Sequence, residues 1–221
     1  MQNISLTSDI NSASSDTIFC PILSGLNAEQ SDCAALIPSG NANGLLIENL
    51  SKKENQKIDQ VALLCTDPFI NKEVLFADLF ELGVRSVTNW PSSIFLDQSF
   101  SKAMTNIKVS PADEFECLSH AMKSGLDAKA FILSLYHGRK ALSLGIRNLI
   151  VHPGLKVELS EEAKSTLYES IHLMIETLIA MEPSVKIYIY QHSAEEASAH
   201  KARYKDSHLK ISGYVVYETS V

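Results

Sequence analysis

Four polar side chains stand at or just past the ends of apolar runs of strand length, where they could do chemistry. These residues are Asp67, Asn89, His152 and His192. A carboxylate or an imidazole can transfer a proton, and a side-chain amide can orient a substrate oxygen. In parallel α/β folds the carboxyl ends of the strands meet at one edge, where ligands bind. We therefore predict that the four converge on one mouth, with Asp67 and His152 catalytic and Asn89 and His192 binding substrate.

Each of these residues also has a structural interpretation. Asp67 precedes Pro68, and its carboxylate could cap backbone N–H groups in an Asp-Pro turn. Asn89 could make a loop hydrogen bond, and His152 could be a neutral imidazole bonded to a loop carbonyl. The chain has no H-E-x-x-H motif and no nucleophilic triad, so the residues alone predict no particular metal.

The elements that would position these residues have the pattern of a (β/α)8 TIM-type barrel. Eight apolar strands separated by helical segments recur at a spacing of roughly 25 residues. A doubly wound open sheet is the competing fold, but the chain lacks the G-x-G-x-x-G fingerprint typical of it. The predicted strands are Thr17–Leu23, Cys33–Ile37, Val61–Cys65, Val84–Thr88, Ala130–Leu135, Arg147–Val151, Val185–Tyr190 and Ile211–Tyr217.

Bulk properties set the domain organisation and narrow the class of protein. The chain has 221 residues, and we expect residues 17–221 to form one barrel domain after a polar, disordered leader over residues 1–16. A net charge of -7 argues against nucleic-acid binding, and no apolar run is long enough to cross a membrane. The four cysteines are widely spaced, which predicts free thiols and a reducing, cytoplasmic location.

The last helix of the predicted barrel is missing. No helical segment follows the strand Ile211–Tyr217, so the outer face beside Thr17–Leu23 would be left without cover. A soluble monomer rarely exposes an apolar surface of that size. We therefore expect a homo-oligomer in which a neighbouring subunit covers this region.

Several short motifs, taken in order, resemble the TIM-barrel family of phosphoenolpyruvate or phosphonopyruvate hydrolase-like proteins, which also supplies one half of a plant tobamovirus-resistance protein. The motifs are Cys65-Thr66-Asp67-Pro68-Phe69, Asn89-Trp90-Pro91-Ser92, Leu96-Asp97, His152-Pro153-Gly154-Leu155 and Ser212-Gly213-Tyr214. The resemblance covers about residues 22–218. It implies an enzyme that acts on a small 2-oxo acid or related carbonyl compound by hydrolysis or C–C/C–P cleavage, with a divalent cation such as Mg²⁺. It also favours Asp97 as a substrate-binding residue, and we add Ser39 and Glu218 from their places at strand ends.

The chain also departs from the pattern of that family. Gln30 stands where the family has a lysine, and the arginine-containing segment expected after Pro38-Ser39-Gly40 is absent. Ser193-Ala194 replaces a glycine pair. Lysine and arginine are the residues best suited to hold a carboxylate or phosphate. Their loss disfavours a phosphorylated substrate and leaves an alternative, a barrel that has lost catalysis and acts as a binding or regulatory subunit.

Overall fold

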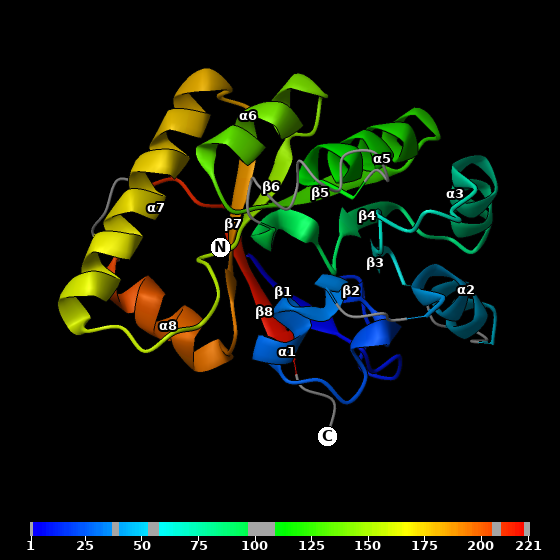
Figure 1. Cartoon of the computed structure of the whole chain (residues 1–221), viewed down its shortest axis with the longest axis horizontal. Helices are drawn as coiled ribbons and strands as arrows, with labels where there is room; N and C mark the ends of the chain where they lie inside the picture. The colour runs from blue at the N-terminus through cyan, green and yellow to red at the C-terminus, as the bar shows by residue number, and fades with distance from the viewer. Residues whose placement is uncertain (1, 37–39, 53–57, 97–108, 205–208, 219–221) are drawn as a thin grey trace.

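Eight parallel strands pair in chain order, and the eighth pairs with the first to close a barrel (Figure 1). The fold is therefore the predicted TIM-type barrel. The computed structural model describes residues 2–36, 40–52, 58–96, 109–204 and 209–218. The strands are β1 (Gln2–Thr7), β2 (Thr17–Phe19), β3 (Gln60–Leu63), β4 (Ser86–Asn89), β5 (Asp127–Ile132), β6 (Asn148–Val151), β7 (Lys186–Gln191) and β8 (Gly213–Glu218).

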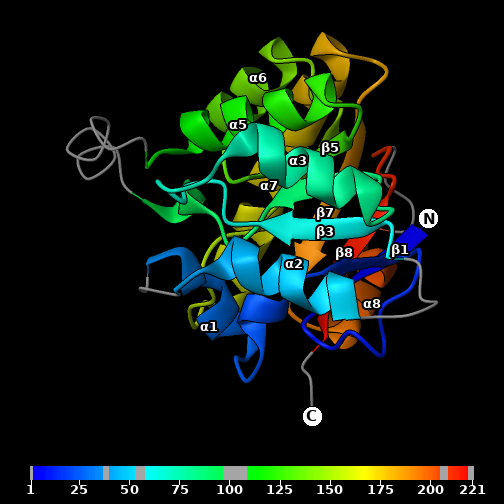
Figure 2. The same ribbon diagram turned by 90° about the vertical axis from the view of Figure 1, so that its right-hand side faces the viewer.

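Helices surround the barrel on the outside (Figures 1 and 2). In the described residues they are α1 (Ala28–Asp32), α2 (Ala42–Lys52), α3 (Lys72–Glu81), α5 (Pro111–Lys123), α6 (Leu135–Ser143), α7 (Glu161–Met181) and α8 (Ala194–Arg203), with short 3₁₀ turns η1 (Pro21–Leu23), η2 (Ala34–Leu36) and η3 (Ser93–Phe95). None of these helices is long and apolar enough to cross a bilayer. One apolar layer fills the space between strands and helices, and a second fills the barrel interior.

The expected disordered leader is wrong for residues 2–7, because they form β1. Ile4 and Leu6 are buried in the barrel interior, whereas Asn3 is exposed, as the alternation of a strand requires. β1 pairs with β8 from Gln2 to Thr7 and with β2 over its last three residues. These residues therefore supply the strand that closes the barrel.

The predicted second strand, Cys33–Ile37, is also wrong. The segment before it is the helix α1, and Ala34–Leu36 form a 3₁₀ turn. Asn27 and Gln30 make a reciprocal capping box that starts α1, and this box outweighs the apolar run that follows. The first predicted strand, Thr17–Leu23, is a strand only as far as Phe19.

The uncovered apolar face on which we based the homo-oligomer is not found in the described part of the chain. The neighbour of β8 is β1 rather than Thr17–Phe19, and no helix is described after β8. Because Ile4 and Leu6 point inward, the outward side chains of β1 are those of Asn3, Ser5 and Thr7, which are polar. The homo-oligomer stays a prediction without this support.

Replacing Leu6 by alanine tests the role of β1. Leu6 is fully buried, so Leu6→Ala should lower the free energy of unfolding by about 2–5 kcal/mol through lost burial and a residual cavity. Asn3→Ala, on the exposed side of the same strand, should change it by no more than about 0.5 kcal/mol. Urea unfolding followed by circular dichroism measures both. Equal stability of the two variants would mean that residues 2–7 are not part of the barrel.

Candidate functional site

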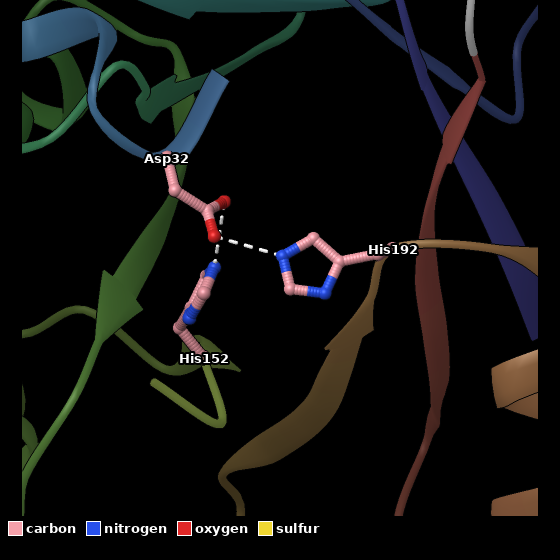
Figure 3. Close-up of side chains that lie close together, drawn as sticks. All are labelled: Asp32, His152 and His192. Atoms are coloured by element: carbon pink, nitrogen blue, oxygen red, sulfur yellow. Dashed lines mark hydrogen bonds and ion pairs between the residues drawn. The ribbon is translucent and has the colours of Figure 1, made fainter. Parts of the chain in front are cut away.

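Three side chains from distant parts of the chain meet at the carboxyl ends of the strands (Figure 3). Asp32 is the last residue of α1, His152 follows β6, and His192 follows β7. Nε2 of His152 lies 3.1 Å from Oδ1 of Asp32, and Nε2 of His192 lies 2.8 Å from Oδ2. Each carboxylate oxygen thus has its own imidazole partner.

Two hydrogen bonds fix the short helix α1 and the segment before it to the barrel. The indole N–H of Trp90, in the loop after β4, donates to Oγ of Ser31 at 3.0 Å. The hydroxyl of Tyr217 in β8 donates to the carbonyl oxygen of Leu26 at 2.8 Å. These two bonds set the position of the Asp32 carboxylate relative to β6 and β7.

His152 is neutral and carries its proton on Nε2. The backbone N–H of Gly154 donates to Nδ1 at 3.1 Å, so Nδ1 must be the acceptor, and Nε2–H donates to Asp32. Burial lowers the pKa of His152, and the hydrogen bond to Asp32 offsets only part of this effect. The ring is also stacked against Trp90 and Tyr190, at centroid distances of 5.5 and 4.5 Å. His152 is therefore held on both nitrogens and on its faces.

His192 is the charged member of the cluster. Burial alone would lower its pKa, but the hydrogen bond with Asp32 and the neighbouring carboxylate of Glu196 outweigh burial and raise the pKa to about 9. Its Nδ1 lies 3.6 Å from a carboxylate oxygen of Glu196 in α8. For Asp32 the effects have the opposite signs: burial alone would raise its pKa, but the hydrogen bonds with the two imidazoles lower it. At neutral pH the cluster is a carboxylate, an imidazolium and a neutral imidazole.

By proximity, the three residues could hold a metal ion, since one ligand atom from each lies within 4.8 Å of the others. The protons do not fit this role. Coordination through Nε2 of His152 would move the proton to Nδ1, which already faces the N–H of Gly154. Two nitrogens and one carboxylate are also not the oxygen-rich set that Mg²⁺ prefers. As it stands, the cluster is arranged to hold protons.

Asp67 lies outside this cluster. Its Oδ1 accepts a hydrogen bond from the backbone N–H of Phe69 at 2.9 Å, and its Oδ2 accepts one from Asn43 at 3.2 Å. The first contact is that of the Asp-Pro turn, and the second joins this turn to α2. Its catalytic role stays a prediction, and the structure does not bring it to Asp32.

Asn89 is fully buried and bonded within the protein. Its Oδ1 accepts from the N–H of Phe131 at 2.7 Å, and its Nδ2 donates to the Glu114 carboxylate at 2.7 Å. Ser92 and the N–H of Ser93 donate to the same carboxylate. Burial raises the pKa of Glu114, and these donors counteract only part of it. Asn89 therefore joins β4 to β5 and α5 in the structure.

Of the three remaining predicted binding residues, the structure describes only Glu218. Ser39 and Asp97 lie outside the described residues. Glu218 ends β8, is exposed and accepts a hydrogen bond from Ser5.

The residue that sequence reasoning missed is Asp32. One signal was present: the pair Asn27 and Gln30 has the spacing of a capping box, which places a helix start directly after the early strand. Helix capping accounts for two of the departures noted in the sequence. Gln30 occupies the lysine position as a helix cap, and Ser193 caps α8, where it accepts from the N–H of Glu196.

The phosphoenolpyruvate hydrolase-like family matches residues 24–216, which is most of the chain. The chain belongs to this family. A curated relative, the uncharacterized protein y4oT of Sinorhizobium fredii (strain NBRC 101917 / NGR234), is 27% identical over 157 residues, covering 68% of this chain and 79% of that protein. The resemblance seen in the short motifs is thus confirmed as membership of the family.

A solved structure shares the fold of this family member. A candidate phosphonomutase from Burkholderia cenocepacia J2315 aligns with a TM-score of 0.50 at 12% identity, over 98% of this chain and 85% of that one. A native KDPGal structure aligns with a TM-score of 0.42 at 12% identity, over 97% and 82%. The whole chain also aligns with only 66% of a designed cube-shaped protein cage, with a TM-score of 0.46 and 11% identity. At 12% identity the likeness to the candidate phosphonomutase concerns the fold alone.

The raised pKa of His192 predicts how stability depends on pH. A folded pKa of about 9, above the ordinary 6.5, gives a contribution that is complete below pH 6.5 and is lost as pH rises through 9. The loss should be on the order of 2 kcal/mol after allowing for screening by solvent. The free energy of unfolding, measured with urea from pH 6 to 10, should therefore fall more steeply for the native protein than for His192→Gln. His120→Gln, at an exposed histidine, should follow the native curve, and parallel curves for all three would refute the ion pair.

The contacts of Asn89 predict a cost to stability. Asn89→Ala leaves the N–H of Phe131 and the Glu114 carboxylate short of partners, so the free energy of unfolding should fall by about 1–3 kcal/mol. Chemical denaturation measures the change, with the exposed Asn11→Ala as the control. A variant with native stability and weakened ligand binding would instead restore the role in substrate binding.

Proposed function

We propose that the protein is an enzyme acting on a small 2-oxo acid or related carbonyl compound, with the Asp32–His192 pair as its acid–base centre. The observation that carries the proposal is the 2.8 Å contact between Asp32 and His192 at the carboxyl end of β7. Barrel enzymes place their reacting groups at this end of the strands. The substrate class rests on the family, and the roles rest on the contacts.

The three residues have different roles in this proposal. The His192 side chain is 7% exposed, whereas those of His152 and Asp32 are 0% and 1% exposed, so His192 is the member nearest the solvent. With Nε2 bound to Asp32, its Nδ1–H is the proton that can be transferred, and its charge attracts a carboxylate. Asp32 keeps this ring oriented and protonated. His152, with both nitrogens occupied, is a positioning residue that holds Asp32 rather than a base.

Protonation of an enolate carbon or of a leaving oxygen is the step that such an acid can assist. Hydrolysis and C–C or C–P cleavage of a 2-oxo acid each pass through a species with negative charge on the enol oxygen. A nearby imidazolium stabilises that charge before it gives up its proton. No step is assigned to Mg²⁺, because the donor set does not favour it.

A binding or regulatory subunit is the second candidate, and one contact favours it. Gln30 stands where the family has a lysine, and its side chain is engaged in the cap of α1. It cannot replace a cation that would hold a phosphate or carboxylate. Under this proposal the barrel keeps a ligand but does not turn it over. The expected homo-oligomer and the cytoplasmic location accompany both candidates as predictions.

A screen for ligands and turnover separates the two. Pyruvate, oxaloacetate, phosphonopyruvate and phosphoenolpyruvate are each added with and without Mg²⁺ or Zn²⁺, and the melting temperature is measured, because a ligand bound only to the folded state raises it. Products are followed by proton and phosphorus NMR. The enzyme proposal expects at least one acid to stabilise the protein and to be converted.

His192→Gln should then lower kcat by about 10²–10⁴-fold, the range usual for a general acid. The native enzyme should lose kcat above about pH 9, and the variant should not show this fall. His120→Gln serves as the matched control and should retain full activity. Stabilisation without turnover would support the binding subunit. If an acid is converted and His192→Gln converts it as fast as the native protein does, the assignment of the acid–base centre is contradicted.

A further inference from the structure

Tyr190 has a hydroxyl that the folded chain leaves without an aligned partner. The residue is fully buried in the barrel interior, in β7 two positions before His192. Its oxygen has no hydrogen bond of good geometry among the described residues. Buried hydroxyl groups nearly always have a partner, because an unpaired one is costly. An unpaired group beside a candidate site therefore calls for an explanation.

The ring of Tyr190 cannot turn away to find a partner elsewhere. It is stacked on His152 at 4.5 Å with an interplanar angle of 22°, and it contacts Phe131 and Trp90 at centroid distances of 5.7 and 5.6 Å. The His192 ring meets its edge at 5.2 Å. The ring is thus held next to both imidazoles, and its hydroxyl lies near the Asp32 carboxylate.

The charge around this hydroxyl fits the role of a donor. Burial raises the pKa of Tyr190 well above its ordinary value, and the nearby Asp32 carboxylate raises it further, so the proton stays on the oxygen. The hydroxyl and the imidazolium of His192 are two proton-bearing groups close to one carboxylate. An incoming ligand oxygen could accept from both.

We propose that Tyr190 is a further ligand-binding residue, whose hydroxyl donates a hydrogen bond to the carboxylate or enolate oxygen that His192 attracts. This inference rests on the proposed function and adds a specific contact to it. The ligand class is a small planar acid with two adjacent oxygens, one for each donor. A group that remains unpaired until the ligand arrives loses no internal bond on binding, which favours affinity.

Oxalate is the probe, because its two coplanar carboxylates present the oxygens of the enolate of pyruvate. Its binding to native protein, Tyr190→Phe and Tyr217→Phe is measured by calorimetry, and the melting temperature of each ligand-free protein is recorded. Tyr217 is the matched control, since its hydroxyl has a partner, the carbonyl oxygen of Leu26. Tyr190→Phe should weaken oxalate binding about 10-fold while leaving the melting temperature unchanged or higher. Tyr217→Phe should lower the melting temperature.

The outcomes are distinct. Unchanged oxalate affinity in Tyr190→Phe overturns the contact and leaves the proposed function standing. A lowered melting temperature in ligand-free Tyr190→Phe also overturns it, because the hydroxyl would then have a partner such as Asp32 inside the protein. Failure of the native protein to bind oxalate or any acid of the earlier screen overturns the proposed ligand class, and the Tyr190 contact with it.

Discussion

A buried carboxylate bonded to two imidazoles is the interaction on which the rest of the site depends. Removing a charge from water is costly, and Asp32 is almost inaccessible to solvent, so its charge must be matched inside the protein. His192 supplies the opposite charge and His152 supplies a neutral donor. Because the aromatic interior of the barrel lies beneath them, the surroundings are apolar and each of these bonds is stronger than it would be in water.

Closure of the barrel is what brings these residues together. Asp32 is 120 residues from His152 and 160 from His192 along the chain. The contact requires that the early part of the chain return to the late strands, and β1 makes this return by pairing with both β2 and β8. The bond from Tyr217 in β8 to the segment before α1 fastens the same junction. By closing the barrel, β1 therefore also brings α1 close to the ends of β6 and β7.

The sequence predicted the strands from β3 onward well and the first two poorly, for physical reasons. Strands such as β3 and β6 are buried on both faces, so they read as unbroken apolar runs. β1 is apolar only at alternate positions and precedes a serine-rich loop, which made its residues resemble a leader. His152 and His192 could be found because they follow such runs directly. Asp32 could not be found in this way, because what marks it as a site residue is its contact with two histidines more than a hundred residues away.

The second buried carboxylate shows why the chemistry belongs with Asp32. Glu114 is satisfied by an amide, a hydroxyl and a backbone N–H, none of which can give up a proton near neutral pH, so it can only anchor. What it anchors is the turn from Asn89 to Ser93, and Trp90 lies within that turn. Trp90 in turn donates to Ser31, the residue beside Asp32. Glu114 thus fixes the loop that contains Trp90, and this loop fixes the end of α1 that carries Asp32. Of the two carboxylates, only Asp32 has a titratable partner to which a proton can pass.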